Sequence, residues 1–169
     1  MVKPVARRQL TAFLSGPVCE DVERVRRRWD PIMSDQIGAH FTICHELDDR
    51  QLGQIDILRR HPRLRVRIGG VRCWGQPSLG IYLEVEDADG ALDSLRDSLG
   101  VGSESAVPFT PHVTLTHPRT TPQERADEAW TALSAWRIDS DIEVSLIDVI
   151  EHDGTRWTSA HQLLLHGRA

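Results

Sequence analysis

The sequence of 169 residues contains few cysteines, and they follow no pairing pattern. There are three, Cys19, Cys44 and Cys73, an odd number without CxxC spacing. Secreted domains that depend on disulfides usually carry an even set of cysteines at close spacing. We therefore expect reduced thiols and a cytoplasmic protein.

The sequence also lacks long hydrophobic runs and low-complexity tracts. The first eight residues lead into an apolar run of only a few residues, too short for a secretory signal or a membrane span. A content of 40% hydrophobic and 27% charged residues is typical of a globular protein. The length fits one domain over residues 1–169, made of two small lobes that share a core. No membrane contact is expected.

An excess of positive charge is absent as well, since the net charge is −5 and the pI about 5.9. A protein that binds many phosphates usually carries a basic face, because each neutralised phosphate releases counterions. We therefore expect no extended nucleic-acid surface, and any such substrate would be held at one or a few nucleotides. Arginines concentrate in residues 24–28 and 59–72, and either cluster could supply a local patch. The first is expected on a solvated helix face.

Hydrophobic periodicity and turn residues predict alternating strands and helices. This order favours an α+β fold with two mostly antiparallel sheets flanked by helices. Two similar halves suggest a bilobal, pseudo-symmetric arrangement. The expected strands are residues 9–16, 37–47, 63–73, 79–85, 108–117, 138–151 and 155–166, and the expected helices are 18–29, 51–60, 90–99 and 122–135.

One six-residue pattern occurs twice. Residues 40–45 read His-Phe-Thr-Ile-Cys-His and residues 112–117 read His-Val-Thr-Leu-Thr-His, 72 positions apart (112 minus 40). Alternate residues of a strand share one face. His40 and Thr42 would then lie on one face of their strand, and the second copy would present the same pair.

Two histidines and two threonines suit the cleavage of a phosphodiester. A neutral imidazole removes the proton from the attacking oxygen, and a protonated one supplies a proton to the leaving oxygen. Each transfer is typically worth roughly 10²- to 10⁴-fold in rate. Threonine hydroxyls can donate to the non-bridging phosphate oxygens, where negative charge accumulates. These four side chains need no metal for those steps.

The tetrapeptides His-Phe-Thr-Ile and His-Val-Thr-Leu resemble the paired signature of the 2H phosphoesterase superfamily. This superfamily includes the 2′-5′ RNA ligase-like proteins and RNA 2′,3′-cyclic phosphodiesterases. Residues 29–31, 71–75, 108–111 and 157–165 also resemble its bacterial members. The resemblance implies a bilobal α+β fold with a central groove and no metal cofactor. It also implies action on 2′,3′-cyclic phosphates or 2′-5′ linkages, in RNA 3′ ends or small cyclic nucleotides.

Carried over to this sequence, the resemblance makes His40 and His112 the acid–base pair. Thr42 and Thr114 become the residues that bind the phosphate. We expect His112 to activate water and His40 to protonate the leaving oxygen, although the similarity of the halves also permits the reverse.

Four further residues near the motifs are weaker candidates. Phe109 and Trp74 could stack on a base, as aromatic residues do in readers of single-stranded RNA, or simply pack. Arg119 and Arg72 could hold a phosphate or remain solvated.

His45 and His117 extend the repeat and invite a metal-binding interpretation. Their offset of five places them on the strand face opposite His40 and His112, and it is not the spacing of a zinc helix. We therefore expect a structural or solvent-exposed role. Two other function classes stay open: a non-catalytic module that binds nucleotides or RNA ends in the same groove, and a zinc enzyme. The sequence contains no pattern that indicates an oligomeric state.

Overall fold

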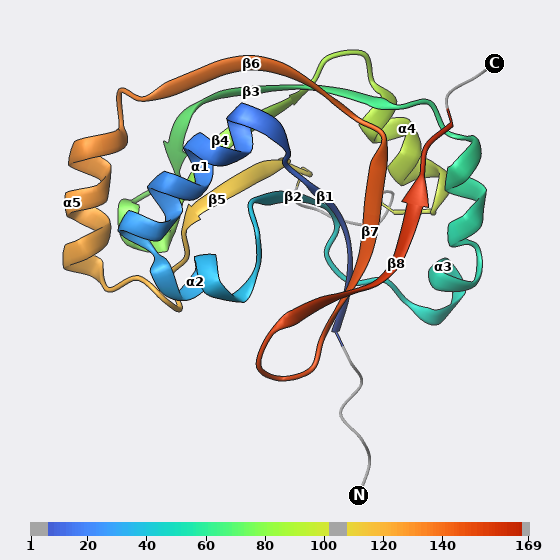
Figure 1. The fold of residues 1–169 in the computed structure, drawn as a ribbon, viewed down its shortest axis with the longest axis horizontal. Helices are drawn as coiled ribbons and strands as arrows, with labels where there is room; N and C mark the ends of the chain where they lie inside the picture. The colour runs from blue at the N-terminus through green and yellow to red at the C-terminus, as the bar shows by residue number, and fades with distance from the viewer. Residues whose placement is uncertain (1–6, 102–107, 167–169) are drawn as a thin grey trace, which may run out of the picture.

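The computed structural model describes residues 7–101 and 108–166, and its strands form one antiparallel sheet (Figure 1). The strands are β1 (Arg7–Phe13), β2 (His40–Cys44), β3 (Leu64–Cys73), β4 (Ile81–Asp87), β5 (His112–Thr116), β6 (Arg137–Val144), β7 (Leu146–His152) and β8 (Trp157–Leu164). Their order across the sheet is β6-β3-β4-β5-β2-β1-β7-β8. The two strands that carry the repeated motif are therefore neighbours at its centre.

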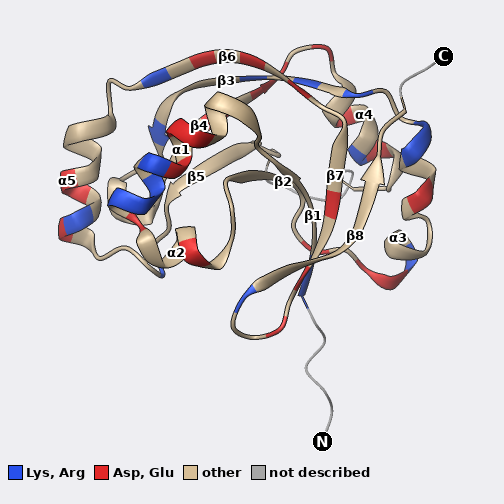
Figure 2. Cartoon of the chain, viewed as in Figure 1, with Lys and Arg blue, Asp and Glu red and all other residues tan. Residues whose placement is uncertain are grey.

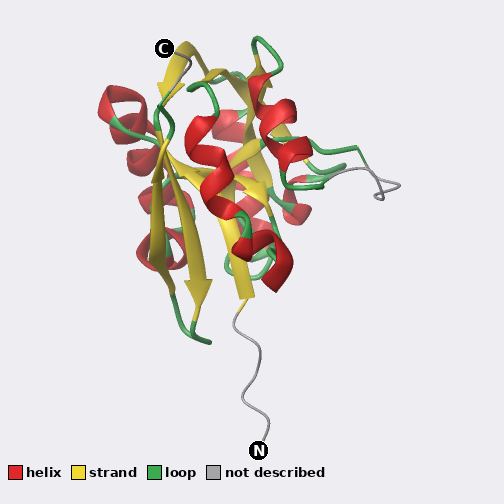
Figure 3. Cartoon of the chain, turned by 90° about the vertical axis from the view of Figure 1, so that its right-hand side faces the viewer, coloured by secondary structure: helices red, strands yellow, loops and turns green. Residues whose placement is uncertain are grey.

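Short helices flank this sheet (Figure 3). They are α1 (Gly16–Trp29), α2 (Pro31–Gln36), α3 (Asp49–Gly53), α4 (Ala91–Ser98) and α5 (Gln123–Leu133), with 3₁₀ turns η1 (Ile55–Arg60) and η2 (Pro77–Leu79). The helix expected over 51–60 is instead α3 followed by η1. Within the described ranges, no helix is long and apolar enough to cross a membrane.

The predicted α+β class with antiparallel strands is confirmed, but the two expected sheets are joined into one. The junction is the pairing of β2 with β5, where Phe41 lies opposite Val113. An unpaired strand edge leaves backbone N–H and C=O groups without partners. Joining the two motif strands removes two such edges from the middle of the molecule.

The single strand expected over 138–151 is wrong, because the chain changes partners at Ser145. β6 pairs with β3 at one edge of the sheet, whereas β7 pairs with β1 in the other half. Figure 1 shows this segment passing over the top of the molecule before it turns down into β7. No glycine or proline marks the change, although the buried positions shift there from Val144 to Ile147 and Val149, with Leu146 left exposed. The hairpin predicted between β7 and β8 is present.

Strand alternation places the apolar residues of both motifs in the core, as predicted. Phe41 and Ile43 in β2 are fully buried, and so are Val113 and Leu115 in β5. The histidines and threonines of the two strands consequently point to the opposite face.

A buried aspartate fixes the far end of β5 to the junction between α1 and α2. One carboxylate oxygen of Asp30 accepts from the Met33 N–H (3.1 Å), which caps α2. The other accepts from the His117 N–H (2.8 Å) and the Thr120 hydroxyl (2.7 Å). Asp30 is only 1% exposed, so all three bonds are shielded from water.

We expect Asp30→Asn to lower the free energy of unfolding by about 1–3 kcal/mol, since the amide cannot accept from every donor that the carboxylate satisfies. Urea denaturation measures this change. The matched control is Asp35→Asn on the exposed face of α2, for which we expect a change within about 0.5 kcal/mol. Equal stability of the two variants would contradict a tethering role for Asp30.

Candidate functional site

The four side chains of the repeated motif line one cleft of about 500 Å³. β2 supplies His40 and Thr42, and β5 supplies His112 and Thr114. Both strands present these pairs to the same face because they are neighbours in the sheet and alternate in the same sense. The structure thus brings together residues that lie 72 positions apart in the sequence (112 minus 40).

The lining of this cleft is rich in histidine and arginine. It includes five histidines, His40, His45, His112, His117 and His152, and three arginines, Arg7, Arg26 and Arg119. Among the described residues, no aspartate or glutamate lines it. In a protein of net charge −5, such a surface favours an anionic ligand.

His45 and His117 line the cleft, so the expectation that they face away from His40 and His112 is wrong. The alternation rule does not reach them because β2 ends at Cys44 and β5 ends at Thr116. Even so, no three His, Cys, Asp or Glu side chains lie close enough to share a metal ion in the part of the chain that the structure describes.

Both motif histidines are oriented by a backbone carbonyl two residues upstream. The Nδ1 atom of His40 lies 2.7 Å from the Gly38 oxygen, and that of His112 lies 2.8 Å from the Thr110 oxygen. A carbonyl only accepts, so Nδ1 carries the proton in both neutral rings. Nε2 is then the atom left to exchange a proton with a ligand.

The pKa of His40 is lowered to about 4, chiefly by burial and further by the positive charge of Arg26, against the opposing effect of the Gly38 bond. Burial also lowers the pKa of His112. Both imidazoles are therefore neutral near pH 7 in the ligand-free protein. A bound anion raises the pKa of a nearby imidazole, because it stabilises the protonated form.

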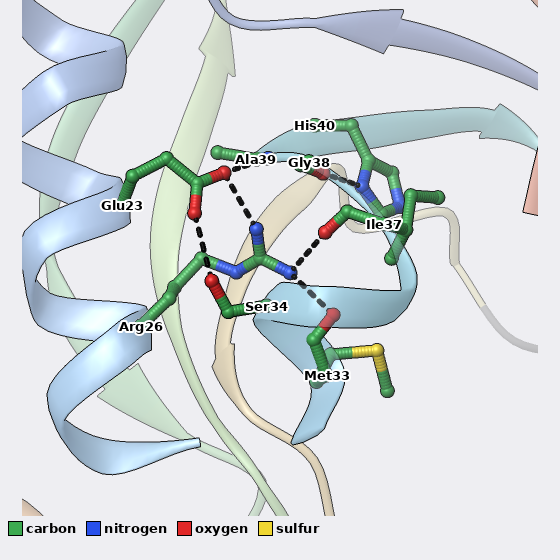
Figure 4. Close-up of polar contacts among 8 residues, drawn as sticks. All are labelled: Glu23, Arg26, Met33, Ser34, Ile37, Gly38, Ala39 and His40. Atoms are coloured by element: carbon green, nitrogen blue, oxygen red, sulfur yellow. Dashed lines mark hydrogen bonds and ion pairs between the residues drawn. The ribbon is translucent and has the colours of Figure 1, made fainter. Parts of the chain in front are cut away.

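The arginines of residues 24–28 were expected on a solvated helix face, and for Arg26 this is wrong. Its side chain is 1% exposed and reaches the cleft, instead of lying on a solvated helix face. The guanidinium donates to Glu23 (2.8 Å) and to the Ile37 carbonyl (2.8 Å) (Figure 4). Helical spacing contained the signal, since Arg26 follows the buried Val22 by four positions.

Glu23 extends this contact to the segment that leads into β2. Its carboxylate accepts from the Ser34 hydroxyl (3.1 Å) and from the Ala39 N–H (Figure 4). Together, Glu23 and Arg26 fix residues 37–39 against α1. The Gly38 carbonyl that orients His40 belongs to this segment.

Two of the weaker candidates, Trp74 and Phe109, lie beside the cleft and not in it. Trp74 stacks on Tyr82 with ring centroids 4.3 Å apart, and meets His112 edge-on at 5.0 Å. The Arg96 guanidinium lies 3.4 Å from the Phe109 ring centroid. Trp74 and Phe109 line a second cavity that shares His45 and His112 with the cleft.

The structure brings Arg119 to the cleft but not Arg72. Arg72 forms an ion pair with Glu84 (3.0 Å), and other arginines of residues 59–72 are paired in the same way. In Figure 2, acidic residues of β6 lie next to basic residues of β3. The remaining pairs are Arg59 with Asp56, Arg63 with Glu143 and Arg67 with Asp141. These carboxylates offset the positive charge of residues 59–72, the second cluster that could have supplied a local patch.

Comparison with known proteins gives one family and several similar folds. Residues 14–156 match the family model described as the 2′-5′ RNA ligase superfamily. The crystal structure of E. coli LigT complexed with 3′-AMP superposes with a TM-score of 0.64 at 17% identity, over 95% of this chain and 98% of that one. TT0787 of Thermus thermophilus gives 0.63 at 15% identity, over 96% and 100%. A search of curated proteins found no match. At these identities, the structural likeness shows the fold.

We expect His40 to titrate near pH 4 in the ligand-free protein, and at a higher pH when inorganic phosphate is bound in the cleft. NMR titration of the imidazole signals measures both values, and loss of one signal in His40→Asn identifies the residue. A pKa at or above the ordinary 6.5 without ligand would contradict the desolvated environment described above.

Proposed function

Since the chain belongs to the 2′-5′ RNA ligase superfamily, we propose that it is a phosphodiesterase that hydrolyses 2′,3′-cyclic phosphate ends of RNA or nucleotides without a metal ion. The observation that carries this proposal is the meeting of two His-Thr pairs in a cleft whose described lining contains no carboxylate. E. coli LigT has been crystallised with 3′-AMP and with phosphate, which supports a ligand of nucleotide size with a phosphate group.

In the proposed reaction, His112 acts as the general base. Its Nδ1–H is held by the Thr110 carbonyl, so the unprotonated Nε2 accepts the proton of a water molecule. The water oxygen then attacks phosphorus and forms the new P–O bond. Base catalysis requires a neutral imidazole, which the lowered pKa of His112 provides at neutral pH.

His40 acts as the general acid on the other side of the phosphate. The bond between phosphorus and one ribose oxygen breaks, and that oxygen takes the proton of the His40 Nε2–H. The product is a phosphomonoester with a free neighbouring hydroxyl. His40 must first gain this proton, and the negative charge of the phosphodiester favours its uptake because the anion stabilises the imidazolium.

Thr42 and Thr114 bind the non-bridging oxygens of the same phosphate. Their hydroxyls extend from β2 and β5 next to the two histidines. Hydrogen bonds to these oxygens strengthen as charge accumulates on them in the transition state. Because each strand supplies one histidine and one threonine, the phosphate would be held from both sides.

We expect His40→Ala and His112→Ala each to lower the turnover of a 2′,3′-cyclic mononucleotide at least about 100-fold in excess chelator, since each removes one proton transfer. Product formation is followed chromatographically. His166→Ala, an exposed histidine outside the cleft, is the matched control and should keep full activity.

Undiminished turnover in either motif variant would remove the mechanism. If the wild type binds nucleotide phosphates but hydrolyses no cyclic phosphate, the non-catalytic binding module becomes the better description. Loss of wild-type activity in chelator would instead indicate a metal-dependent enzyme.

The pH dependence should separate the free protein from the substrate complex. The kcat/KM profile reports groups of the free enzyme, so we expect a bell whose optimum lies below pH 6.5, because the pKa values of both imidazoles are lowered. Bound phosphodiester raises the pKa of the acid, and the alkaline limb of the kcat profile should therefore lie at higher pH. Coincident alkaline limbs would show that bound substrate does not raise the pKa of the acid.

A further inference from the structure

Three side chains from three neighbouring strands form a row at one end of the cleft. Arg7 in β1 lies directly opposite His152 in β7, and His152 lies directly opposite Trp157 in β8. Residues that are opposite each other in adjacent strands share one face of a sheet. All three line the cleft, where the loop from β7 to β8 reaches the start of β1 (Figure 1).

The contacts within this row bring two nitrogen-bearing groups to an aromatic ring. The imidazole of His152 and the indole of Trp157 have centroids 4.9 Å apart. The guanidinium carbon of Arg7 lies over the Trp157 ring, 5.9 Å from its centroid. The Gly154 N–H donates to Nδ1 of His152 (3.2 Å), so a neutral His152 carries its proton on Nε2 and can donate from there.

Strand register places the row to one side of the paired His-Thr residues. β1 runs antiparallel to β2, with Phe13 opposite His40 and Leu10 opposite Cys44. Arg7, three residues before Leu10, therefore lies beyond the His45 end of β2. The row can thus contact a second nucleotide of a substrate whose scissile phosphate is held by the two motifs.

Among the described residues, the Arg7 guanidinium contacts the Trp157 ring and forms no ion pair. Its neighbour Arg8 pairs with Asp49 (2.7 Å) and Glu151 (2.9 Å), whereas Arg7 has no carboxylate partner among the described residues. Arg7 and Trp157 also lie outside residues 14–156, which the family model matches. His152, the third member of the row, lies inside that range.

We propose that Arg7, His152 and Trp157 form a subsite for the nucleotide next to the scissile phosphodiester, so that the preferred substrate is an RNA end of at least two nucleotides. Trp157 stacks on the base, and Arg7 and His152 donate to the adjoining phosphate. Sites for single-stranded nucleic acid commonly combine an aromatic platform with cationic side chains. This subsite rests on the proposed function, because it is defined relative to the phosphate held by His40 and His112.

Calorimetric binding of two stable ligands tests the subsite: adenosine 3′-phosphate, and the dinucleotide ApA with a 3′-phosphate. We expect the wild type to bind the dinucleotide about 10-fold or more tightly than the mononucleotide, in the range that one base stack contributes. Arg7→Ala and Trp157→Ala should each lose most of this preference, because they weaken dinucleotide binding much more than mononucleotide binding.

Two matched variants separate loss of the subsite from misfolding and from the mere removal of a positive charge. Trp157→Phe keeps an aromatic face and should retain most of the preference. Arg156→Ala removes a neighbouring, exposed arginine that does not line the cleft, and should retain all of it. A wild type without preference for the dinucleotide, or equal preference in all variants, would overturn the subsite.

Hydrolysis of A and ApA ends that carry 2′,3′-cyclic phosphate separates this inference from the proposed function. If the dinucleotide preference in binding depends on Arg7 and Trp157 but neither cyclic end is hydrolysed, the subsite holds and the hydrolytic function fails. If both cyclic ends are hydrolysed with equal kcat/KM and bind without preference, the function holds and the subsite fails.

Discussion

Charged side chains on α1 and at its C-terminal end determine how the two motif strands face each other. Glu23 and Arg26 hold the segment before β2, and Asp30 holds the residue that follows β5. The direct pairing of β2 with β5 is short, with Phe41 opposite Val113. Breaking a buried ion pair costs several kcal/mol, although such a pair often adds little net stability over an apolar replacement. The contribution of α1 is therefore to position β2 and β5 relative to each other, and both halves of the cleft depend on this.

One motif histidine must be protonated to act as the acid, and in this positively charged cleft a bound anion is what favours that protonation. Burial keeps both motif imidazoles neutral, and the charge of Arg26 adds to this effect at His40, which suits a base but not an acid. The positive charge of the cleft also attracts a phosphodiester, whose negative charge then favours protonation of an imidazole. The attraction between the cleft and the substrate and the protonation of the acid imidazole thus both arise from the negative charge of the phosphodiester.

Local patterns in the sequence predicted local features of the fold well. Strand alternation placed Phe41 and Val113 in the core, and it placed the histidines and threonines on the opposite face. The exchange of partners at Ser145 was missed, because no glycine or proline interrupts the extended chain there, although the buried apolar positions shift from Val144 to Ile147 and Val149. Alternation also fails one residue past a strand end, which is why the position of His45 was wrong.

The charged residues around the cleft were harder to predict than the motifs. Arg26 falls on the buried face of its helix by spacing, yet an arginine among arginines is normally solvated. Its burial depends on Glu23 and on the Ile37 carbonyl, and only the folded chain brings the latter to it. Arg7 and Trp157 lie 150 positions apart (157 minus 7), and no repeat or spacing connects them.

The passage at Ser145 also has a consequence for how the chain acquires its structure during synthesis. β1 leaves the ribosome well before its neighbour β7, and the two cannot pair until the residues between them have been made; Arg8 and Glu151, which pair across these strands, are 143 residues apart. Such long-range contacts slow folding, because a large loop must close before they form. The two copies of the motif are therefore not separable modules, since the half of the sheet that holds the first copy is completed by β7 and β8, which follow the second copy in the sequence.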